Sequence, residues 1–409
     1  MKGVIAMKAK DYKDFLNECK HEFQVLNYIR KEALKNGFVP YDYSNNNKKL
    51  IFEFNKLIAL IELGNDLEKD GANIIISHMD SPRLNVIPND PFVEKEDGVF
   101  WKTVPYGGII NQSWLDRPLA LVGEVYNKDG KVLINTELDK VYFTATSLLP
   151  HLSGRREMDQ LKSEKLMVRM GRDTIKRIQK KYKLSKEDLQ LADLSFVPAG
   201  KALDIGFDKE LIASYGHDDR CCVFTELKAF FNSEHSNKTK IALFTSYEET
   251  GSGQSSGAES YFIDDIFLEL TGSQIAARRA MRNSKMISAD VQAGYDSNYN
   301  NHFEENAKVI AGNGVGIVPF LGQKRGNDAT IEIREFIRRL CEDNKIPYQI
   351  ETTKVSEGGG GTVSTFFGYK CIDVIDIGIP VLAMHSPQEL ISKKDLESAY
   401  KLYKLFFES

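Results

Sequence analysis

The chain has 409 residues, of which 42% are hydrophobic and 27% are charged, as in an ordinary globular protein. A chain of this length is expected to form two domains, or one large domain that carries an insertion. Its formal net charge is −4 and its pI is about 6.1, so it has no overall positive field to attract nucleic acid or an anionic membrane.

Neither a membrane span nor an export signal is expected. No apolar run approaches the roughly 20 residues of a spanning helix, and Met1-Lys2-Gly3 does not begin a signal-peptide core. The five cysteines fit neither a disulfide framework nor a zinc knuckle. This cysteine usage favours a reducing compartment, so we expect a cytoplasmic protein.

The first part of the chain predicts a helix and three strands. Between residues 11 and 36 apolar side chains recur at three- and four-residue spacing, which is typical of an amphipathic helix, and Gly37 offers a stop. Strand-like runs follow at residues 50–54, 57–61 and 72–76. The last of these runs continues into Ser77-His78-Met79-Asp80-Ser81-Pro82.

From about residue 91 the pattern changes to short strands separated by turns. A basic helical stretch follows, with ten lysines or arginines against four acidic residues between Leu161 and Gln190. A nucleic-acid surface is one interpretation of this excess, but we favour a solvated helix face or a subunit contact. We predict that residues 91–194 form a β-rich domain inserted into a loop of the first domain.

Near residue 195 the alternation of strands and helices returns. Asp218-Asp219 precede a predicted helix, and the apolar runs 241–244 and 286–289 lead to Glu248-Glu249 and Asp290. Two further apolar runs end at His385, and Ser392 opens the last helix with a capping box. This order predicts an α/β fold for residues 1–90 and 195–409, with a mostly parallel sheet sandwiched by helices.

Polar side chains follow the predicted strands at the edge where such sheets bind ligands. We therefore expect one site from His78, Glu248, Glu249, Asp290 and His385. Each signal has an ordinary alternative: a Glu-Glu pair is usually solvated surface charge, and an aspartate after a strand is often a helix N-cap. Five further histidines are assigned to the ordinary category of satisfied core or surface residues: His21, His151, His217, His235 and His302.

The residue types at this site suit a pair of divalent metal ions, because they are imidazoles and carboxylates without cysteine. His78 and Asp80 share a face of an extended strand, so Asp80 can accept the second ring N–H of His78. Three carboxylates and one hydroxide carry four negative charges, which two divalent cations balance and one does not. Glu248 is then left as a proton acceptor beside a metal-bound water.

Five motifs occur in order along nearly the whole chain: Ser77-His78-Met79-Asp80-Ser81-Pro82, Asp218-Asp219-Arg220, Glu248-Glu249-Thr250-Gly251-Ser252, Ser288-Ala289-Asp290 and Met384-His385-Ser386. Together they resemble the aspartyl aminopeptidase and aminopeptidase I family of dinuclear zinc metallo-aminopeptidases. The resemblance implies a catalytic domain like that of zinc exopeptidases and an inserted dimerisation or lid domain. It also implies dimers that assemble into a tetrahedral dodecamer.

The resemblance assigns roles to individual residues. Asp218 would bridge two metal ions, with His385 and Glu249 completing one site and His78 and Asp290 the other. Glu248 matches the general base, and Asp80 the catalytic residue that supports His78. The expected cofactors are two Zn²⁺ ions, with Co²⁺ or Mn²⁺ as alternatives, and the peptide bond Asp218-Asp219 is expected to be cis, as in related enzymes.

Two positions depart from the family pattern. Gln112 stands where the family has a histidine that reaches the neighbouring subunit's active site, and glutamine can donate a hydrogen bond but carries no charge. The segment 318–321 is apolar, with Lys324 a few residues later, so a neutral or hydrophobic first residue of the substrate is as expected as an acidic one. Gln112, Gly359 and Gly360 are the predicted substrate-binding residues, the glycines because their bare backbone can approach a substrate.

We therefore predict a metal-dependent aminopeptidase that acts on peptides through a water bridging two metals, with Glu248 as general base. One alternative is another dinuclear amidohydrolase on the same scaffold, a deacylase or a carboxypeptidase. The other is a non-catalytic oligomeric shell protein stabilised by metals. An uncoordinated Glu248 argues against the shell protein, because a structural site needs no spare base, whereas Gln112 argues mildly for it.

Overall fold

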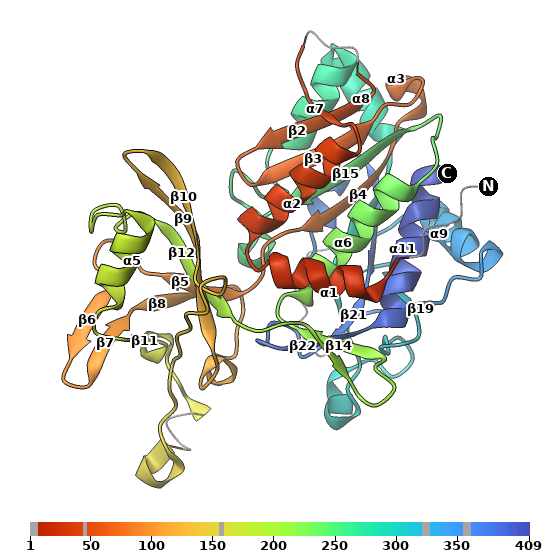
Figure 1. Ribbon diagram of the computed structural model, residues 1–409. Helices are drawn as coiled ribbons and strands as arrows, with labels where there is room; N and C mark the ends of the chain where they lie inside the picture. Colours follow the sequence, from red (N-terminus) through yellow and green to blue (C-terminus); the bar gives the residue numbers. More distant parts are fainter. Residues whose placement is uncertain (1–6, 44–46, 155–158, 321–327, 355–360) are drawn as a thin grey trace. The chain divides into compact units, whose positions relative to one another are not determined.

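The computed structural model describes residues 7–43, 47–154, 159–320, 328–354 and 361–409 (Figure 1). By its internal contacts the chain divides into two compact units. The first unit comprises Met1–Asp80, Ala202–Met384 and Glu389–Ser409, and the second comprises Ser81–Lys201 and His385–Gln388. The predicted insertion, residues 91–194, lies inside the long segment of the second unit.

Within the described residues, a nine-stranded mixed sheet forms the centre of the first unit. Its strands stand in the order β1 (Val39–Pro40), β2 (Lys49–Phe54), β3 (Leu57–Glu62), β15 (Thr239–Thr245), β4 (Ala72–His78), β16 (Lys285–Ala289), β20 (Asp373–Gly378), β18 (Val315–Val318) and β19 (Tyr348–Ile350). The central strands β15, β4, β16 and β20 are parallel, as predicted. Strand β3 is antiparallel to β2 and β15, and β18 is antiparallel to β20. The β2–β3 pair departs from parallel order because two residues, Asn55 and Lys56, connect the strands.

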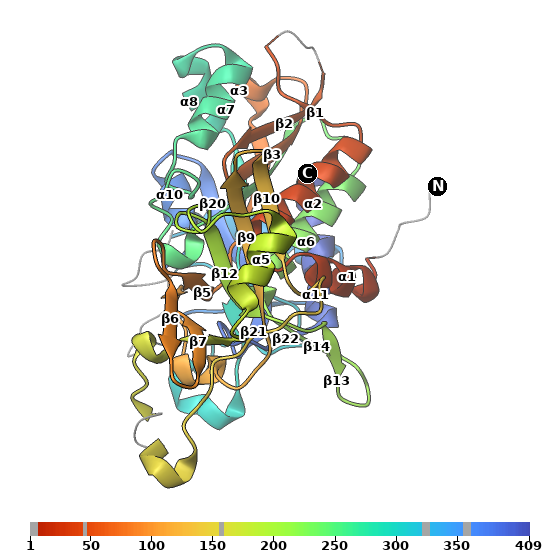
Figure 2. The ribbon, with the colours of Figure 1, turned by 60° about the vertical axis from the view of Figure 1, so that its left-hand side comes forward.

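Helices cover both faces of this sheet, as Figures 1 and 2 show. Ile75 of β4 belongs to a core cluster with helices α1 (Ala9–Glu18), α2 (Glu22–Lys35), α6 (His217–Asn232), α9 (Ile331–Asp343) and α11 (Lys393–Glu408). Ile74 and Ile76 belong to a cluster with α7 (Phe262–Thr271), α8 (Gln274–Arg282) and α10 (Ser364–Gly368). Successive side chains of a strand point to opposite faces, so one apolar run serves both layers.

The stretch predicted as a single helix, residues 11–36, forms two helices instead. The backbone of Cys19 leaves the helical region (φ −111°, ψ 89°), and the side chain of Gln24 accepts a hydrogen bond from the Lys20 N–H (2.8 Å). Both helices pack on the same core, which is why the apolar spacing continues across the break. Gly37, with φ of 81°, follows α2 as the predicted stop.

A smaller sheet of the first unit contains β13 (Leu203–Ile205), β14 (Leu211–Ser214), β22 (Glu389–Ser392), β21 (Pro380–Leu382) and β17 (Gln292–Ala293). The side chain of Ser392 accepts a hydrogen bond from the Lys394 N–H and so caps α11 as predicted. The carboxylate of Asp395, the other half of the predicted capping box, instead accepts from the N–H groups of Gly312 and Gly314. Strand β14 leads into the turn before α6. In the described ranges, no helix is long and apolar enough to cross a membrane.

The second unit is rich in antiparallel strands. One sheet contains β10 (Gly130–Asn135), β9 (Leu119–Asn127), β12 (Asp193–Pro198), β5 (Arg83–Val86) and β8 (Thr103–Tyr106), and a smaller one contains β11 (Val168–Met170), β7 (Gly98–Trp101) and β6 (Phe92–Lys95). Trp101 and Phe196 pack edge to face with ring centroids 5.3 Å apart, so the two sheets share a core. The basic stretch contains α5 (Thr174–Tyr182), labelled in Figure 2.

The central strand should tolerate truncation less well than the edge strand. Ile75→Ala removes a fully buried side chain and should lower the free energy of unfolding by about 2–5 kcal/mol. Ile350→Ala, on edge strand β19 where the side chain is 55% exposed, should change it by about 0.5 kcal/mol or less. Denaturant unfolding followed by circular dichroism measures both, and equal losses would contradict the assignment of β4 to the core.

Candidate metal centre

The candidate site forms where the central parallel strands end. His78 is the last residue of β4, Glu248 and Glu249 follow β15 in a short 3₁₀ helix, and Asp290 directly follows β16. Asp218 is the second residue of α6, in a first turn with non-helical backbone angles. The side chains come together because adjacent parallel strands end on the same side of the sheet.

The ring of His78 lies at the centre of these carboxylates. Its Nε2 atom is 3.2 Å from Asp218 Oδ1, 3.5 Å from Asp290 Oδ1 and 4.0 Å from Glu248 Oε2. This nitrogen is buried and has no well-formed hydrogen bond to the described residues. Two groups that contain His78 have possible ligand atoms that all lie within 4.8 Å of one another: His78 with Asp218 and Glu249, and His78 with Glu248 and Asp290. The site therefore has two adjacent sets of metal-ligating atoms.

Asp80 supports both the histidine and the glutamate pair. The Nδ1 atom of His78 is 3.1 Å from the Asp80 carbonyl oxygen and 3.4 Å from its Oδ1. Because a carbonyl only accepts, Nδ1 carries the proton, and Nε2 faces the carboxylates as a potential ligand. The Asp80 carboxylate also accepts hydrogen bonds from the backbone N–H groups of Glu248 and Glu249, each at 3.3 Å. One buried aspartate thus orients three of the predicted site residues.

The carboxylates are held in an environment that disfavours their charge. Burial, with the charge of Asp290 adding to it, raises the pKa of Glu248 to about 8. Burial also raises the pKa of Glu249 and of Asp290 above their usual values. For His78, burial lowers the pKa, but Asp218, Asp290 and Asp80 outweigh it and raise the pKa well above its usual value. Positive charge stabilises this set of groups, and oxygen and imidazole ligands suit zinc, manganese or cobalt.

Other predicted site residues lie elsewhere. His385 falls in the second unit, where its Nδ1 is 2.6 Å from the Gly108 carbonyl oxygen. The backbone carbonyl oxygen of His385 accepts a hydrogen bond from Trp114 Nε1. Gln112 belongs to the 3₁₀ helix Asn111–Trp114 of that unit. Their roles as metal ligand and substrate contact stay predictions. Gly359, Gly360 and Lys324 lie outside the described residues.

Two expectations about the backbone can be checked directly. The peptide bond between Asp218 and Asp219 is cis, as the family resemblance implies. The alternative in which Asp290 is a helix N-cap is wrong, because the next element is the strand β17. The carboxyl end of strand β16, and not a helix, therefore positions Asp290.

Sequence reasoning missed two buried acids beside the site. Glu389 accepts a hydrogen bond from the backbone N–H of Asp218 (3.1 Å), and Glu226 accepts one from the hydroxyl of Ser77. Burial raises the pKa of Glu226 well above its usual value. The available signal was an acidic residue on an apolar face, since Glu226 lies between Val223 and Leu227 in the buried face of α6.

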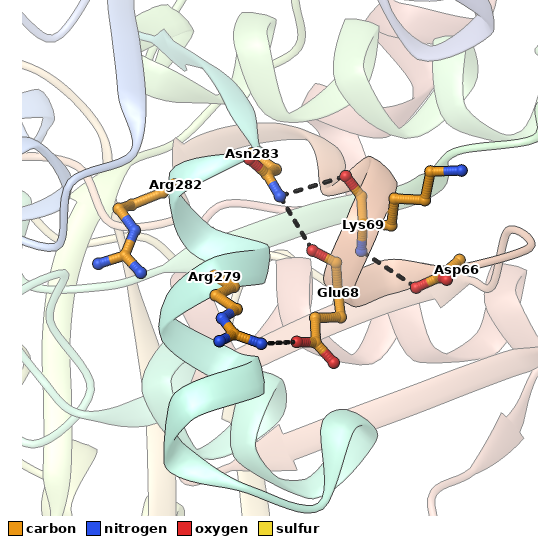
Figure 3. A pocket seen from close by; sticks show the side chains of 6 residues that line it. All are labelled: Asp66, Glu68, Lys69, Arg279, Arg282 and Asn283. Atoms are coloured by element: carbon orange, nitrogen blue, oxygen red, sulfur yellow. Dashed lines mark hydrogen bonds and ion pairs between the residues drawn. The ribbon is translucent and has the colours of Figure 1, made fainter.

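A surface pocket lies at the other end of the same strands (Figure 3). Its lining residues are Asp66, Glu68, Lys69, Arg279, Arg282 and Asn283. They belong to α3 (Leu67–Asp70) and its N-cap Asp66, before the start of β4, and to the end of α8 and its C-cap Asn283, before β16. Arg279 and Glu68 form an ion pair (2.8 Å), and Asn283 donates to the carbonyl oxygens of Glu68 and Lys69. This pocket is separate from the cluster around His78.

Comparison with known proteins finds relatives along almost the whole chain. Residues 15–407 match the family described as aminopeptidase I zinc metalloprotease (M18). A probable M18 family aminopeptidase 1 of Borreliella afzelii (strain PKo) is 36% identical over 446 aligned residues, which cover 100% of this chain and 97% of that protein.

Solved structures of M18 aminopeptidases have a similar fold over almost the whole chain. The crystal structure of an M18 family aminopeptidase from Thermotoga maritima has a TM-score of 0.91 and 31% identity, covering 98% of this chain and 95% of that chain. The S. cerevisiae mApe1 dodecamer has a TM-score of 0.82 at 19% identity, over 98% of this chain and 96% of that chain. At that identity the second likeness concerns the fold alone.

The contact between β20 and the Asp290 segment predicts a sensitive position. A Cβ atom on Gly378 would lie 1.5 Å from the carbonyl oxygen of Asp290, so Gly378→Ala must displace Asp290. We expect divalent-metal affinity to fall about tenfold or more, measured by competition with a chromophoric chelator. Gly171→Ala is the control, since the nearest atom to its added Cβ would be Thr174 Oγ1 at 3.3 Å. Unchanged affinity in Gly378→Ala would contradict the placement of Asp290 as a ligand.

The raised pKa of Glu248 predicts how the metal-free protein responds to pH. The folded pKa of about 8 lies above the unfolded value of about 4.3, so the folded state holds a proton that the unfolded state releases. This stabilisation is complete below about pH 4 and is lost as the pH rises through about 8. The melting temperature of metal-free protein should therefore fall between about pH 5 and 8.

Two comparisons test this pH dependence. Glu248→Gln should flatten part of the decline because it removes one titrating group, and saturating Mn²⁺ should suppress most of it. A metal-free protein whose melting temperature is constant between about pH 5 and 8 would show that burial does not raise the pKa of Glu248 as described.

Proposed function

The chain belongs to the aminopeptidase I zinc metalloprotease family (M18) and is a metallo-aminopeptidase, and from this premise we propose that it removes N-terminal residues from peptides with two divalent metal ions, most simply Zn²⁺. The observation that carries this proposal is the group of four carboxylates around His78 Nε2, contributed by separate segments of the chain. Crowded anions of this kind are stable when cations bind between them.

The proposed ligands follow from the two sets of metal-ligating atoms. Asp218 would lie between the ions, Glu249 and His385 would hold one, and His78 and Asp290 the other. When bound, two divalent cations polarise a scissile carbonyl and lower the pKa of a water molecule. Asp80 keeps the proton on Nδ1 of His78 and so keeps Nε2 directed at the site.

Glu248 is the proposed carrier of the proton. Its carboxylate would take a proton from the attacking water and return it to the nitrogen of the leaving amine. The free α-amine of the substrate would dock against the remaining carboxylates. Since Glu248 Oε2 also lies with His78 and Asp290, a role as third metal ligand is the competing assignment.

Replacing Glu248 separates the two assignments. Glu248→Gln should lower kcat on an aminoacyl-anilide by about 100-fold or more, because an amide cannot accept the proton, while the protein still binds two metal ions. Metal content by mass spectrometry and turnover are measured on the same samples. The exposed Glu305→Gln is the matched control, with wild-type activity expected. Loss of one metal ion would support the ligand assignment, and retained turnover with both ions bound would rule out Glu248 as the base.

The nearest alternative is a deacylase or carboxypeptidase on the same scaffold, and substrate chemistry discriminates them. An aminopeptidase needs a free α-amine, so we expect hydrolysis of a peptide such as Leu-Gly-Gly and at least about 100-fold slower hydrolysis of its N-acetylated form. Preference for the N-acetylated peptide would favour the deacylase. A first residue that is neutral or hydrophobic is proposed to be accepted as readily as an acidic one, because Val318 and Phe320 are apolar.

We also propose that the protein works as a cytoplasmic homo-oligomer. The S. cerevisiae mApe1 structure is a dodecamer, and the β-rich second unit is the proposed dimerisation or lid domain. Dimers would then assemble into a tetrahedral dodecamer, and Gln112 would contribute to a neighbouring subunit's active site. Light scattering of the purified protein gives the mass that tests this assembly.

A further inference from the structure

The first turn of α6, which carries Asp218, departs from helical backbone geometry. The first residues of α6 have non-helical backbone angles, with φ −75° and ψ 107° at Asp218 and φ −114° and ψ 27° at Asp219. Contacts from other parts of the first unit hold this turn. On one side the backbone N–H of Asp218 donates to Glu389 of β22.

On the other side the turn is fixed through His217, which is fully buried. Its Nδ1 atom is 2.7 Å from the hydroxyl oxygen of Tyr12, and its Nε2 is 3.1 Å from the carbonyl oxygen of Ile212. Because that carbonyl only accepts, Nε2 carries the ring proton, and the hydroxyl of Tyr12 donates to Nδ1. Both ring nitrogens are therefore occupied, one by α1 and the other by β14.

Tyr12 is itself held firmly in place. It is fully buried on α1, and its ring packs against Phe224 of α6 with centroids 5.3 Å apart. The bond to His217 joins residues 205 positions apart in the chain. The residue next to Asp218 is thus tied to the N-terminal helix by a specific donor and acceptor pair.

We propose that Tyr12 and His217 are a positioning pair that fixes the Asp218 carboxylate at the metal centre. This inference rests on the proposed function, because it takes Asp218 as a metal ligand. Neither side chain is a catalytic residue. Their effect is exerted through the backbone of the turn, since a metal ligand must be held within a fraction of an ångström of its binding position.

The test compares two conservative variants of the full chain. Tyr12→Phe removes the hydroxyl that holds His217. Tyr403→Phe is the matched control, because Tyr403 is also fully buried and its hydroxyl donates to the carbonyl oxygen of Ile377 (3.1 Å). The affinity for Zn²⁺ is measured on metal-free protein by competition with a chromophoric chelator, and the melting temperature of the metal-free protein is measured beside it.

Both variants should lower the melting temperature by a similar amount, because each loses one buried hydrogen bond. Only Tyr12→Phe should weaken Zn²⁺ binding, by about tenfold. His217→Phe should weaken it as well, because its ring offers no acceptor to the Tyr12 hydroxyl. Wild-type affinity in Tyr12→Phe, or equal weakening in Tyr12→Phe and Tyr403→Phe, would overturn the positioning pair.

A third variant keeps the two proposals apart. If Asp218→Ala binds Zn²⁺ with the affinity and stoichiometry of the wild type, the metal site is wrong and the positioning pair falls with it. If Asp218→Ala loses Zn²⁺ while Tyr12→Phe does not, the metal site stands and only the positioning pair is overturned.

Discussion

Mutual repulsion among the four carboxylates around His78 is the constraint on which the rest of the first unit depends. Burial raises the pKa of Glu248, Glu249 and Asp290, so ionisation at this edge of the sheet is unfavourable unless positive charge lies between them. Cations that bind between these acids in the folded state would raise its stability. The same carboxylates therefore determine both the proposed metal binding and the folding stability.

The surrounding structure limits how far these acids can move apart. The carboxylate of Asp80 holds the backbone of Glu248 and Glu249, and the absence of a side chain at Gly378 lets the Asp290 segment lie against β20. His78 is fixed at the end of a strand with neighbours on both sides. Each acid is thus held by a strand end, a backbone hydrogen bond or a close backbone contact. The binding site for a cation is therefore formed before the cation binds.

The sequence predicts most of the fold that positions this site. The central strands are uninterrupted apolar runs, and parallel order brings their carboxyl ends to one edge. The polar residues that follow these runs are therefore expected in one place: His78, Glu248, Glu249, Asp290 and His385. The structure brings the first four together, and the role of His385 stays a prediction. The break at Cys19 was not predicted because both helices bury the same apolar stripe. The β2–β3 pairing depends on a two-residue connection that the apolar pattern alone does not reveal.

The sequence pattern does not predict contacts between segments that are far apart in the chain. The sequence assigns His217 to the ordinary core or surface histidines, and its partner on α1 lies 205 positions away in the chain. Glu389 stands near His385 in the chain, yet its contact is the backbone N–H of Asp218 on a different element. Spacing describes one strand or helix at a time, whereas these contacts depend on how separate elements pack.

Anomalous X-ray diffraction at the zinc absorption edge, from crystals grown with Zn²⁺, tests the central claim most directly. Two peaks beside the Asp218 carboxylate are expected, one within bonding distance of Glu249 and the other of His78 and Asp290. A map with no peak among these side chains, in crystals where zinc is bound elsewhere, would contradict a metal centre at the end of β4.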